Sequence, residues 1–250
     1  MKINNIIVTM WFNRYNGIKN IYEVFNQKLN EYFPVFNMSN LPANFDPIIP
    51  RINAKSGSGH STLNMSNINL QLITEYDDKF NENFDSCIEY IKTRAKKIYD
   101  ILIENDIKIL YSAVLVNLNK EAENPINDIE NNLLNLNINN NNISELGMRV
   151  SVKLEDKFYK IITVNNRKDF SMQKQIAPGQ FEIIMPLISL CDAKMEKEYI
   201  SINYELNDKY SFDKGKEYLC SNETFDRMFQ VVENDIKINI DDFLTNGVIN

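Results

Sequence analysis

The chain has 250 residues and a formal net charge of −7, and 44% of its side chains are hydrophobic. This length can bury one large core or two small ones. The acidic balance disfavours broad, salt-driven binding to nucleic acid or anionic lipid. The apolar stretches fall short of the roughly 18 residues that a membrane helix needs, and the N-terminal segment resembles a first strand more than a signal peptide. We therefore expect a soluble, cytoplasmic protein.

The three cysteines and the abundant asparagines point to the compartment and the coding bias of the gene. Cys87, Cys191 and Cys220 are far apart and odd in number, which is typical of free thiols in a reducing cytosol. Frequent Lys, Asn and Ile indicate an AT-rich prokaryote, its phage or another mobile element. The asparagine run at 139–142 is interpreted as a solvated loop.

The first part of the chain alternates between the periods of strands and helices. Residues 3–12 predict a strand, and apolar side chains at helical spacing predict a helix from Ile18 to Leu29. A proline-containing connector follows at 41–50. Period-two alternation then predicts strands on either side of a turn near Asn67, and the longest apolar stripe predicts a helix at 81–104.

The second part repeats a similar order of elements. We expect a strand at 107–118 and then a short helix, capped by Asn124 and Pro125, that runs to Leu136. Four strands follow between Leu146 and Leu206, including one at 181–190. A C-terminal helix is expected to begin at Ser221 or Asn222 and to become irregular around the sequence IKINI.

These patterns predict an α+β protein built from two tandem units. The proposed boundaries are 1–106 and 107–250. Each unit is expected to contain an antiparallel sheet in the order strand, helix, three or four strands, helix, with the helices packed on one sheet face. We expect the two units to pack together as one globular body.

The segment AKSGSGHST, residues 54–62, resembles the end of a phosphate-binding P-loop. His60 stands where such a loop has lysine, and a neutral imidazole supplies neither the charge nor the reach that the β- and γ-phosphates need. The residues after Ser61 alternate like a strand, so we expect no helix N-terminus to receive an anion. The interpretation is a hairpin loop with His60 at its tip, which is also a candidate for contact with a partner.

Side chains that could carry chemistry are few and scattered. His60 is the only histidine, so any Cys–His or Ser–His pair must use it. Cys87 and Cys191 sit in apolar patterns typical of a core. The acidic pairs, such as Asp77–Asp78, diverge as neighbours on a strand or helix and do not make a metal site alone. The sequence therefore predicts no catalytic residue, no metal ligand and no cofactor.

Surface residues offer a few candidate contacts. Lys92, Arg94, Lys96 and Lys97 spread over the polar side of the 81–104 helix, beside acidic residues, which is typical of a solvated face. Tyrosines near the last strand could suit a binding surface or serve as ordinary sheet residues. The possible partner contacts are Ser56, Ser58, His60, Lys92, Lys96, Tyr199 and Tyr204.

Two resemblances follow from this layout. The strand, helix, four strands, helix order of 107–246 resembles the repeat of the TATA-binding-protein-like fold, which implies a curved sheet able to serve as a binding saddle. The whole chain resembles a sporadically distributed family of uncharacterised prokaryotic proteins through NNIIVTMWF, YDDKF, IKILYSAVLVNL and IDDFLTNG. This family resemblance implies no catalytic residues, and fold alone does not imply function.

Three functional hypotheses remain. The first is a non-catalytic protein that acts through protein–protein contacts, such as an anti-CRISPR-like inhibitor of a host defence complex encoded by a phage or mobile element. The second is a nucleic-acid-binding protein that uses a sheet face or the helix carrying Lys92 to Lys97. The third is a small-molecule-binding protein or enzyme with a pocket between the two units, involving His60.

Overall fold

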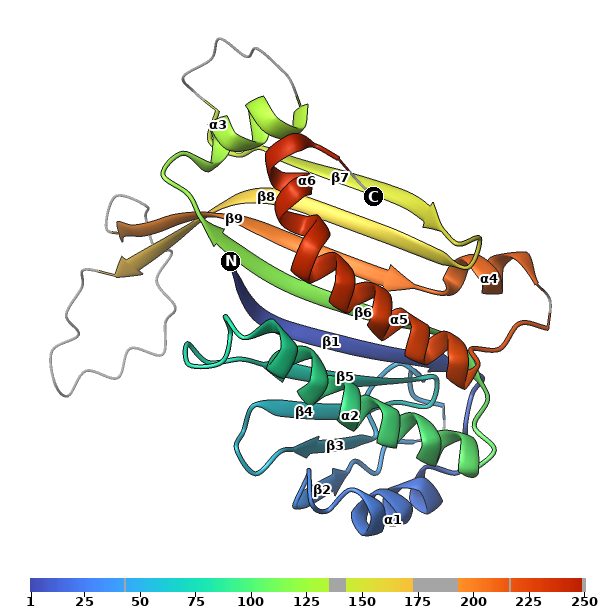
Figure 1. Cartoon of the computed structure of the whole chain (residues 1–250). Coiled ribbons are helices and arrows are strands. Elements are labelled where there is room, and N and C mark those ends of the chain that lie inside the picture. Colours follow the sequence, from blue (N-terminus) through green and yellow to red (C-terminus); the bar gives the residue numbers. More distant parts are fainter. Residues whose placement is uncertain (43, 135–142, 173–192, 216, 249–250) are drawn as a thin grey trace, which may run out of the picture.

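The computed structural model describes the chain except for residues 43, 135–142, 173–192, 216 and 249–250. Nine strands of the described residues form one antiparallel sheet in the order β2-β3-β4-β5-β1-β6-β9-β8-β7 (Figure 1). The α+β class with an antiparallel sheet, expected from the alternating periods, is confirmed. No helix in the described part of the chain is long and apolar enough to cross a membrane.

The first part of the chain forms five strands and two helices. They are β1 (Lys2–Phe12), α1 (Ile18–Lys28), β2 (Val35–Met38), β3 (Ile52–Lys55), β4 (Ser61–Met65), β5 (Asn69–Glu75) and α2 (Phe84–Glu104). The sequence predicts about three strands between the two helices, and the described residues form four. The missed strand is β2, whose four residues are too few for a visible alternation and whose first side chain, Val35, faces solvent.

The described residues of the second part add four strands and several helical segments. They are β6 (Ile109–Glu121), α3 (Pro125–Ile129), the π-helical turn η1 (Glu130–Leu134), β7 (Gly147–Leu154), β8 (Phe158–Met172), β9 (Ala193–Asn207), α4 (Lys209–Lys214), α5 (Asn222–Asn234), η3 (Asp235–Asn239) and α6 (Ile240–Asn246). The predicted strand at 181–190 lies outside the described residues.

Several helix boundaries follow the capping rules that the sequence indicated. The Asn124 side chain accepts a hydrogen bond from the backbone N–H of Asn127, with Pro125 in the first turn. Ser221 likewise accepts from the N–H of Thr224 and begins α5. The irregularity expected around IKINI is the π-helical turn η3 between α5 and α6.

β1 and β6 pair antiparallel in the middle of the sheet. Their register runs from Lys2 opposite Asn119 to Phe12 opposite Ile109. Strands β2 to β5 lie on the β1 side of this junction and β7 to β9 lie on the β6 side. The two expected sheets are therefore one continuous sheet, with the first strand of each expected unit at its centre.

Helices α2, α5 and α6 pack against the same face of this sheet (Figure 1). Side chains alternate across each strand, so Ile6 and Val8 are buried under the helices while Ile7 on the opposite face is only half-buried. α4 packs at one end of that opposite face, where the Phe212 ring lies 5.2 Å from the ring of Tyr111. The core is therefore the layer between the sheet and α2, α5 and α6.

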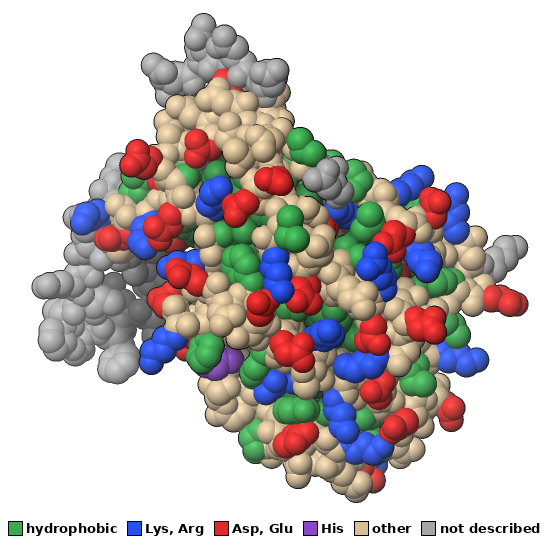
Figure 2. All heavy atoms as spheres, in the orientation of Figure 1, with side chains coloured by type: hydrophobic (Ala, Val, Ile, Leu, Met, Phe, Trp, Pro, Cys, Tyr) green, Lys and Arg blue, Asp and Glu red, His purple; other side chains and the backbone are tan. Residues whose placement is uncertain are grey.

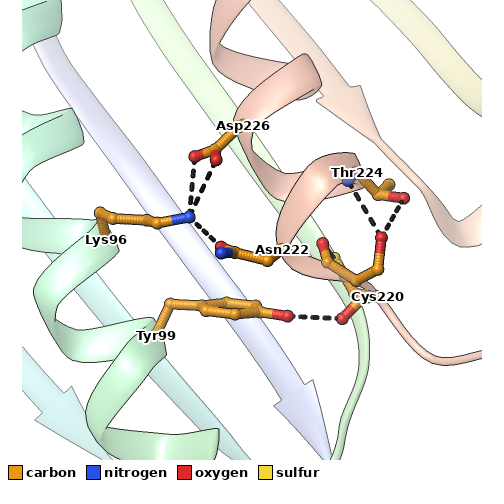
Figure 3. A network of polar contacts seen from close by, with 7 residues as sticks. Lys96, Tyr99, Cys220, Asn222, Thr224 and Asp226 are labelled. Carbon is orange, nitrogen blue, oxygen red and sulfur yellow. Dashed lines mark hydrogen bonds and ion pairs between the residues drawn. The ribbon is translucent and has the colours of Figure 1, made fainter.

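A polar and aromatic bridge joins α2 to the start of α5 (Figure 3). Lys96 Nζ lies 2.9 Å from Asp226 Oδ2 and also donates to Asn222. Tyr99 donates from its hydroxyl to the backbone carbonyl of Cys220 at 2.7 Å, and its ring stacks on Phe225 at 4.8 Å. The two longest helices are thus fixed side by side although their sequences are more than a hundred residues apart.

A buried charged group fixes η3 against the second half of the sheet. Lys160 Nζ on β8 lies 2.9 Å from Asp235 Oδ2, and both side chains are almost fully buried. Tyr204 on β9 donates from its hydroxyl to the same carboxylate oxygen at 2.6 Å, and Asn239 donates to the other oxygen at 2.7 Å. Burial and the Asp235 charge together raise the pKa of Tyr204 well above its usual value, so the phenol stays neutral.

Replacing Asp235 by Asn should destabilise the protein strongly, because it leaves the Lys160 charge without the carboxylate of Asp235 in a buried position. We expect a loss of about 3 to 5 kcal/mol in the free energy of unfolding, measured by urea denaturation. The control is Asp226→Asn, the same chemical change at a partly exposed pair, which should cost about 1 kcal/mol or less. Equal losses in the two variants would contradict a special role for the buried pair.

Candidate functional site

The loop between β3 and β4 is a closed hairpin turn. Ser56 pairs with Ser61 through its backbone N–H and accepts from the N–H of Ser61 through its Oγ, at 2.8 and 2.9 Å. Gly59 has a φ of +80°, a backbone region in which glycine is not strained. The carbonyl of His60 accepts from the N–H of Glu75, which fixes the loop to β5. The predicted hairpin loop is confirmed.

The residues after this loop are extended. β4 begins at Ser61 and pairs with both β3 and β5, so no helix N-terminus follows the glycines. A phosphate placed in this loop would meet His60 where a P-loop has its lysine, and no helix amide groups follow the glycines. The segment therefore resembles a P-loop in sequence and not in structure.

A cavity of about 350 Å³ opens beside the hairpin on the helix-covered face of the sheet. Ser58 and His60 line it from the loop, Thr74 and Glu75 from the end of β5, and Tyr76, Asp77 and Phe80 from the connection to α2. Ser86, Cys87 and Tyr90 line it from the first two turns of α2. Residues from three consecutive segments of the chain thus form its walls.

The walls of the cavity are mainly apolar and aromatic. The rings of Tyr76 and Tyr90 meet edge to face at 6.4 Å. Tyr76 donates from its hydroxyl to the backbone carbonyl of Cys87 at 2.6 Å, which uses its polar group inside the protein. Phe80 is 55% exposed at the same cavity. An apolar group entering here would be surrounded by rings whose polar atoms are already satisfied.

The position of Tyr90 is set by a cation and by the hairpin. The guanidinium of Arg94 lies 3.5 Å from the centroid of the Tyr90 ring and 4.7 Å from that of Tyr32. Ser61 Oγ lies 2.9 Å from Thr74 Oγ1 and donates to the Tyr90 hydroxyl at 3.5 Å. The wall formed by α2 is therefore tied to both strands that support the loop.

Carboxylates lie at the mouth of the cavity. Glu75, Asp77 and Asp78 are exposed, and the first two line the opening. His60 Nε2 lies 4.0 Å from Asp77 Oδ2, and the side chains of both are about two-fifths exposed. The mouth therefore combines negative charge with one imidazole, above an apolar interior.

The thiol of Cys87 has the environment of a core residue. It is 1% exposed and donates to the backbone carbonyl of Phe80 at 3.2 Å. Burial raises the pKa of the Cys87 thiol to about 11, so the nucleophilic thiolate is scarce near neutral pH. The cavity is therefore suited to binding an apolar group and poorly suited to a cysteine-dependent reaction.

Among the described residues, no cluster of three or more His, Cys, Asp and Glu side chains could hold a metal ion.

The structure brings together only some of the predicted contact residues. Ser58 and His60 line the cavity, while Ser56 is buried and holds the turn. Lys92 is half-buried on α2, and Lys96 is engaged by Asp226. Their helix therefore offers less free positive charge than its sequence indicates.

Tyr199 and Tyr204 do not offer their rings to a partner in this structure. Tyr199 is 5% exposed and donates from its hydroxyl to Asp169 at 2.9 Å. Tyr204 is fully buried between the sheet and η3. The alternation of β9 places Tyr204 on the helix-covered face, where its hydroxyl is needed by Asp235. We correct their assignment from surface contacts to residues of the interior.

Sequence reasoning missed the residues that give the cavity its apolar character. Tyr76 and Phe80 lie in the connection after β5 and Tyr90 lies on α2, so the three share no common period. One available signal was Phe80, a large apolar residue outside both the preceding strand and the following helical stripe.

No protein-family model matches the chain, and no curated protein sequence is significantly similar to it. Function must therefore be inferred from the geometry and chemistry of the surface.

Treating the folded protein with iodoacetamide at about pH 8 should leave Cys87 and Cys220 unmodified, because burial keeps both thiols protonated. Mass spectrometry of the cysteine-containing peptides measures the outcome. The same treatment in urea should alkylate both thiols. Alkylation of Cys87 in the folded protein at the rate seen in urea would show that the cavity exposes a reactive thiol.

Proposed function

We propose that the protein is a non-catalytic binding protein that recognises a partner protein through the cavity beside His60. The observation that carries this proposal is an apolar, aromatic cavity at a surface hairpin, with Phe80 exposed at its mouth. A large apolar side chain of a partner would be removed from water there and would contribute much of the binding energy.

The charges around the cavity define the sequence that the partner should present. Glu75 and Asp77 line the opening, and the next two residues of the chain, Asp78 and Lys79, are exposed. A partner with Lys or Arg beside its apolar anchor would meet complementary charge, which increases the association rate and the selectivity. The expected ligand is therefore an aromatic or large aliphatic residue flanked by basic residues.

The distribution of charge on the helix-covered face supports a protein partner over nucleic acid. Lys and Arg side chains are interspersed with Asp and Glu across this face (Figure 2). Lys96, one of the residues expected to contact nucleic acid, is paired with Asp226. A mixed surface on a chain of net charge −7 gives little counterion release on binding phosphates.

A small-molecule ligand is the second candidate for the same cavity. Its volume of about 350 Å³ lies at the lower end of the range of ligand pockets, roughly 300 to 1,000 Å³. The exposure of Phe80 favours the protein partner. Its ring at the mouth would contact the partner's surface around the apolar side chain that enters the cavity. The cavity is lined entirely by residues 58–90, rather than by residues of both expected units.

The specific hypothesis of an anti-CRISPR-like inhibitor stays a prediction. It shares with the present proposal a stable scaffold and a complementary surface, without a catalytic motif. The identity of the partner is a separate question from the chemistry that recognises it.

Selection of a random peptide library on the immobilised protein tests the proposal. We expect enrichment of peptides that carry an aromatic or large aliphatic residue next to Lys or Arg. Ser86→Trp, which places a large ring at the cavity wall, and Phe80→Ala should each weaken the best peptide by about tenfold or more. Fluorescence polarisation with the labelled peptide measures the affinity.

The matched control is Ile238→Ala, which removes another exposed apolar side chain outside the cavity. It should leave the affinity unchanged. Circular dichroism confirms that all three variants are folded. Selection of peptides without an apolar anchor, or an equal effect of Ile238→Ala and Ser86→Trp, would contradict the proposal. Binding of a drug-sized apolar compound without any peptide binding would favour the small-molecule candidate.

The acidic mouth should contribute in a salt-dependent manner. We expect the double variant Glu75→Gln, Asp77→Asn to bind the selected basic peptide about three- to tenfold more weakly at low salt, with the difference shrinking as salt screens the charges. Asp213→Asn with Glu217→Gln is the control, because it removes the same charge at exposed residues outside the cavity. A salt-independent loss of affinity would show that the carboxylates act through structure instead of charge.

A further inference from the structure

A second cleft lies at the other end of β4 and carries positive charge. It has a volume of about 630 Å³ and is lined by Arg14, Lys19, Arg51 and Asn67, together with apolar Met38 and Leu41. The segments around it are the connection after β1, the first turn of α1, the end of β2 and the turn between β4 and β5. Among the described residues that line it, none is Asp or Glu.

Arg51 is the central cation of this cleft, and it is 5% exposed. Its Nε donates to Asn67 Oδ1 at 3.1 Å and its Nη1 donates to the carbonyl of Pro42 at 3.5 Å. Both hydrogen-bond acceptors are neutral, and no carboxylate within the described residues forms an ion pair with Arg51. A buried guanidinium normally has a counter-charge, so the site is electrostatically incomplete without an anion.

The position of Arg51 is fixed before any ligand arrives. Its backbone N–H donates to the carbonyl of Met65, and its carbonyl accepts from Ser39. Asn67, which holds Nε, also donates through Nδ2 to the carbonyl of Tyr15 at 2.8 Å. The guanidinium is therefore connected, through Asn67, to the segment that precedes α1. The remaining N–H groups of Arg51 are oriented before a ligand binds.

The N-terminus of α1 faces the same cleft and is not capped. Gly17 at the cap position has no side chain to accept a hydrogen bond, and the first turn contains no acidic residue. No acceptor from the described residues reaches the N–H groups of Ile18, Lys19 and Asn20. Ile18 and Lys19 line the cleft. These orphan donors and the helix dipole favour an anion at this position.

We propose that this cleft binds a phosphate monoester of a small molecule. The phosphoryl group lies between the Arg51 guanidinium and the first turn of α1, and Lys19 and Arg14 add positive charge at the entrance. A tetrahedral dianion can accept from a guanidinium and from helix N–H groups at once. Met38 and Leu41 leave apolar surface for the organic part of the ester. This site is distinct from the cavity beside His60.

Isothermal titration calorimetry of the intact protein at constant ionic strength tests the site. The probes are inorganic phosphate, ribose 5-phosphate and phenyl phosphate. We expect all three to bind the wild-type protein, and phenyl phosphate to bind more tightly than inorganic phosphate because its ring can contact Met38 and Leu41. Equal affinity for the three probes would show that the site recognises only the phosphoryl group and that free phosphate is its ligand. Absence of binding by all three would overturn the proposal.

Three variants locate the binding. Lys19→Gln and Arg14→Gln change exposed side chains and should weaken phosphate binding about three- to tenfold each. Arg51→Gln should abolish measurable binding. Lys97→Gln is the control, because it removes one exposed positive charge on α2 and should leave the affinity unchanged.

The experiment still tests the site if Arg51→Gln does not fold. Lys19→Gln and Arg14→Gln alter surface residues, and their phosphate affinities can be compared with that of Lys97→Gln. Equal weakening by Lys19→Gln and Lys97→Gln would show that only net charge matters, and would overturn the site. Full affinity in a folded Arg51→Gln variant would do the same. Peptide binding at the cavity beside His60 should be unchanged in these variants, so the two proposals fail or stand separately.

Discussion

The antiparallel pairing of β1 with β6 is the constraint on which the rest of the structure depends. Each strand buries one row of aliphatic side chains under the helices, and the pairing aligns these rows, for example Val8 opposite Val114. Because the two strands are at the centre of one sheet, the helices that follow each half, α2 and α5, lie next to each other on the same face. The bridge from Lys96 to Asp226 and the stacking of Tyr99 on Phe225 are consequences of this arrangement. They add specificity to a contact whose main driving force is apolar burial.

The same constraint determines where a rigid cavity can form. α2 supplies Cys87 and Tyr90 to the wall of the cavity, and two turns later it supplies Lys96 to the bridge with α5. A helix held against both the sheet and a second helix cannot shift easily, so the space between its first turns and the end of β5 is maintained without a ligand. The hairpin loop is fixed separately, through the pairing of β4 with β5. The cavity is therefore preformed, which reduces the entropy that binding must overcome.

Periodicity predicted the parts of the fold in which one face of an element is buried. The stripe from Cys87 to Leu102 and the alternation of β4 and β5 both report burial on one side, which is a property of local sequence. β2 escaped because four residues carry too little of a period. Tyr204 was misjudged because its role depends on Asp235, thirty-one residues later in the chain. The sequence predicted only part of the candidate site. Ser58 and His60 were recognised as a loop tip, whereas Phe80 and Tyr90 become neighbours of that loop only through the packing of α2. Tertiary contacts of this kind leave no trace in spacing.

Both binding surfaces inferred from the structure lie at opposite ends of β4. His60 precedes the strand and Asn67 follows it, and at about 3.3 Å per extended residue the two ends are roughly 20 Å apart. One end is acidic around an apolar cavity, and the other is basic around an uncapped helix. Charges of opposite sign at this distance on a surface are largely screened from each other at physiological salt, where the Debye length is about 8 Å. A partner and an anion can therefore occupy the same half of the protein at once, and any coupling between them would have to pass through β4 and its neighbours instead of through the solvent.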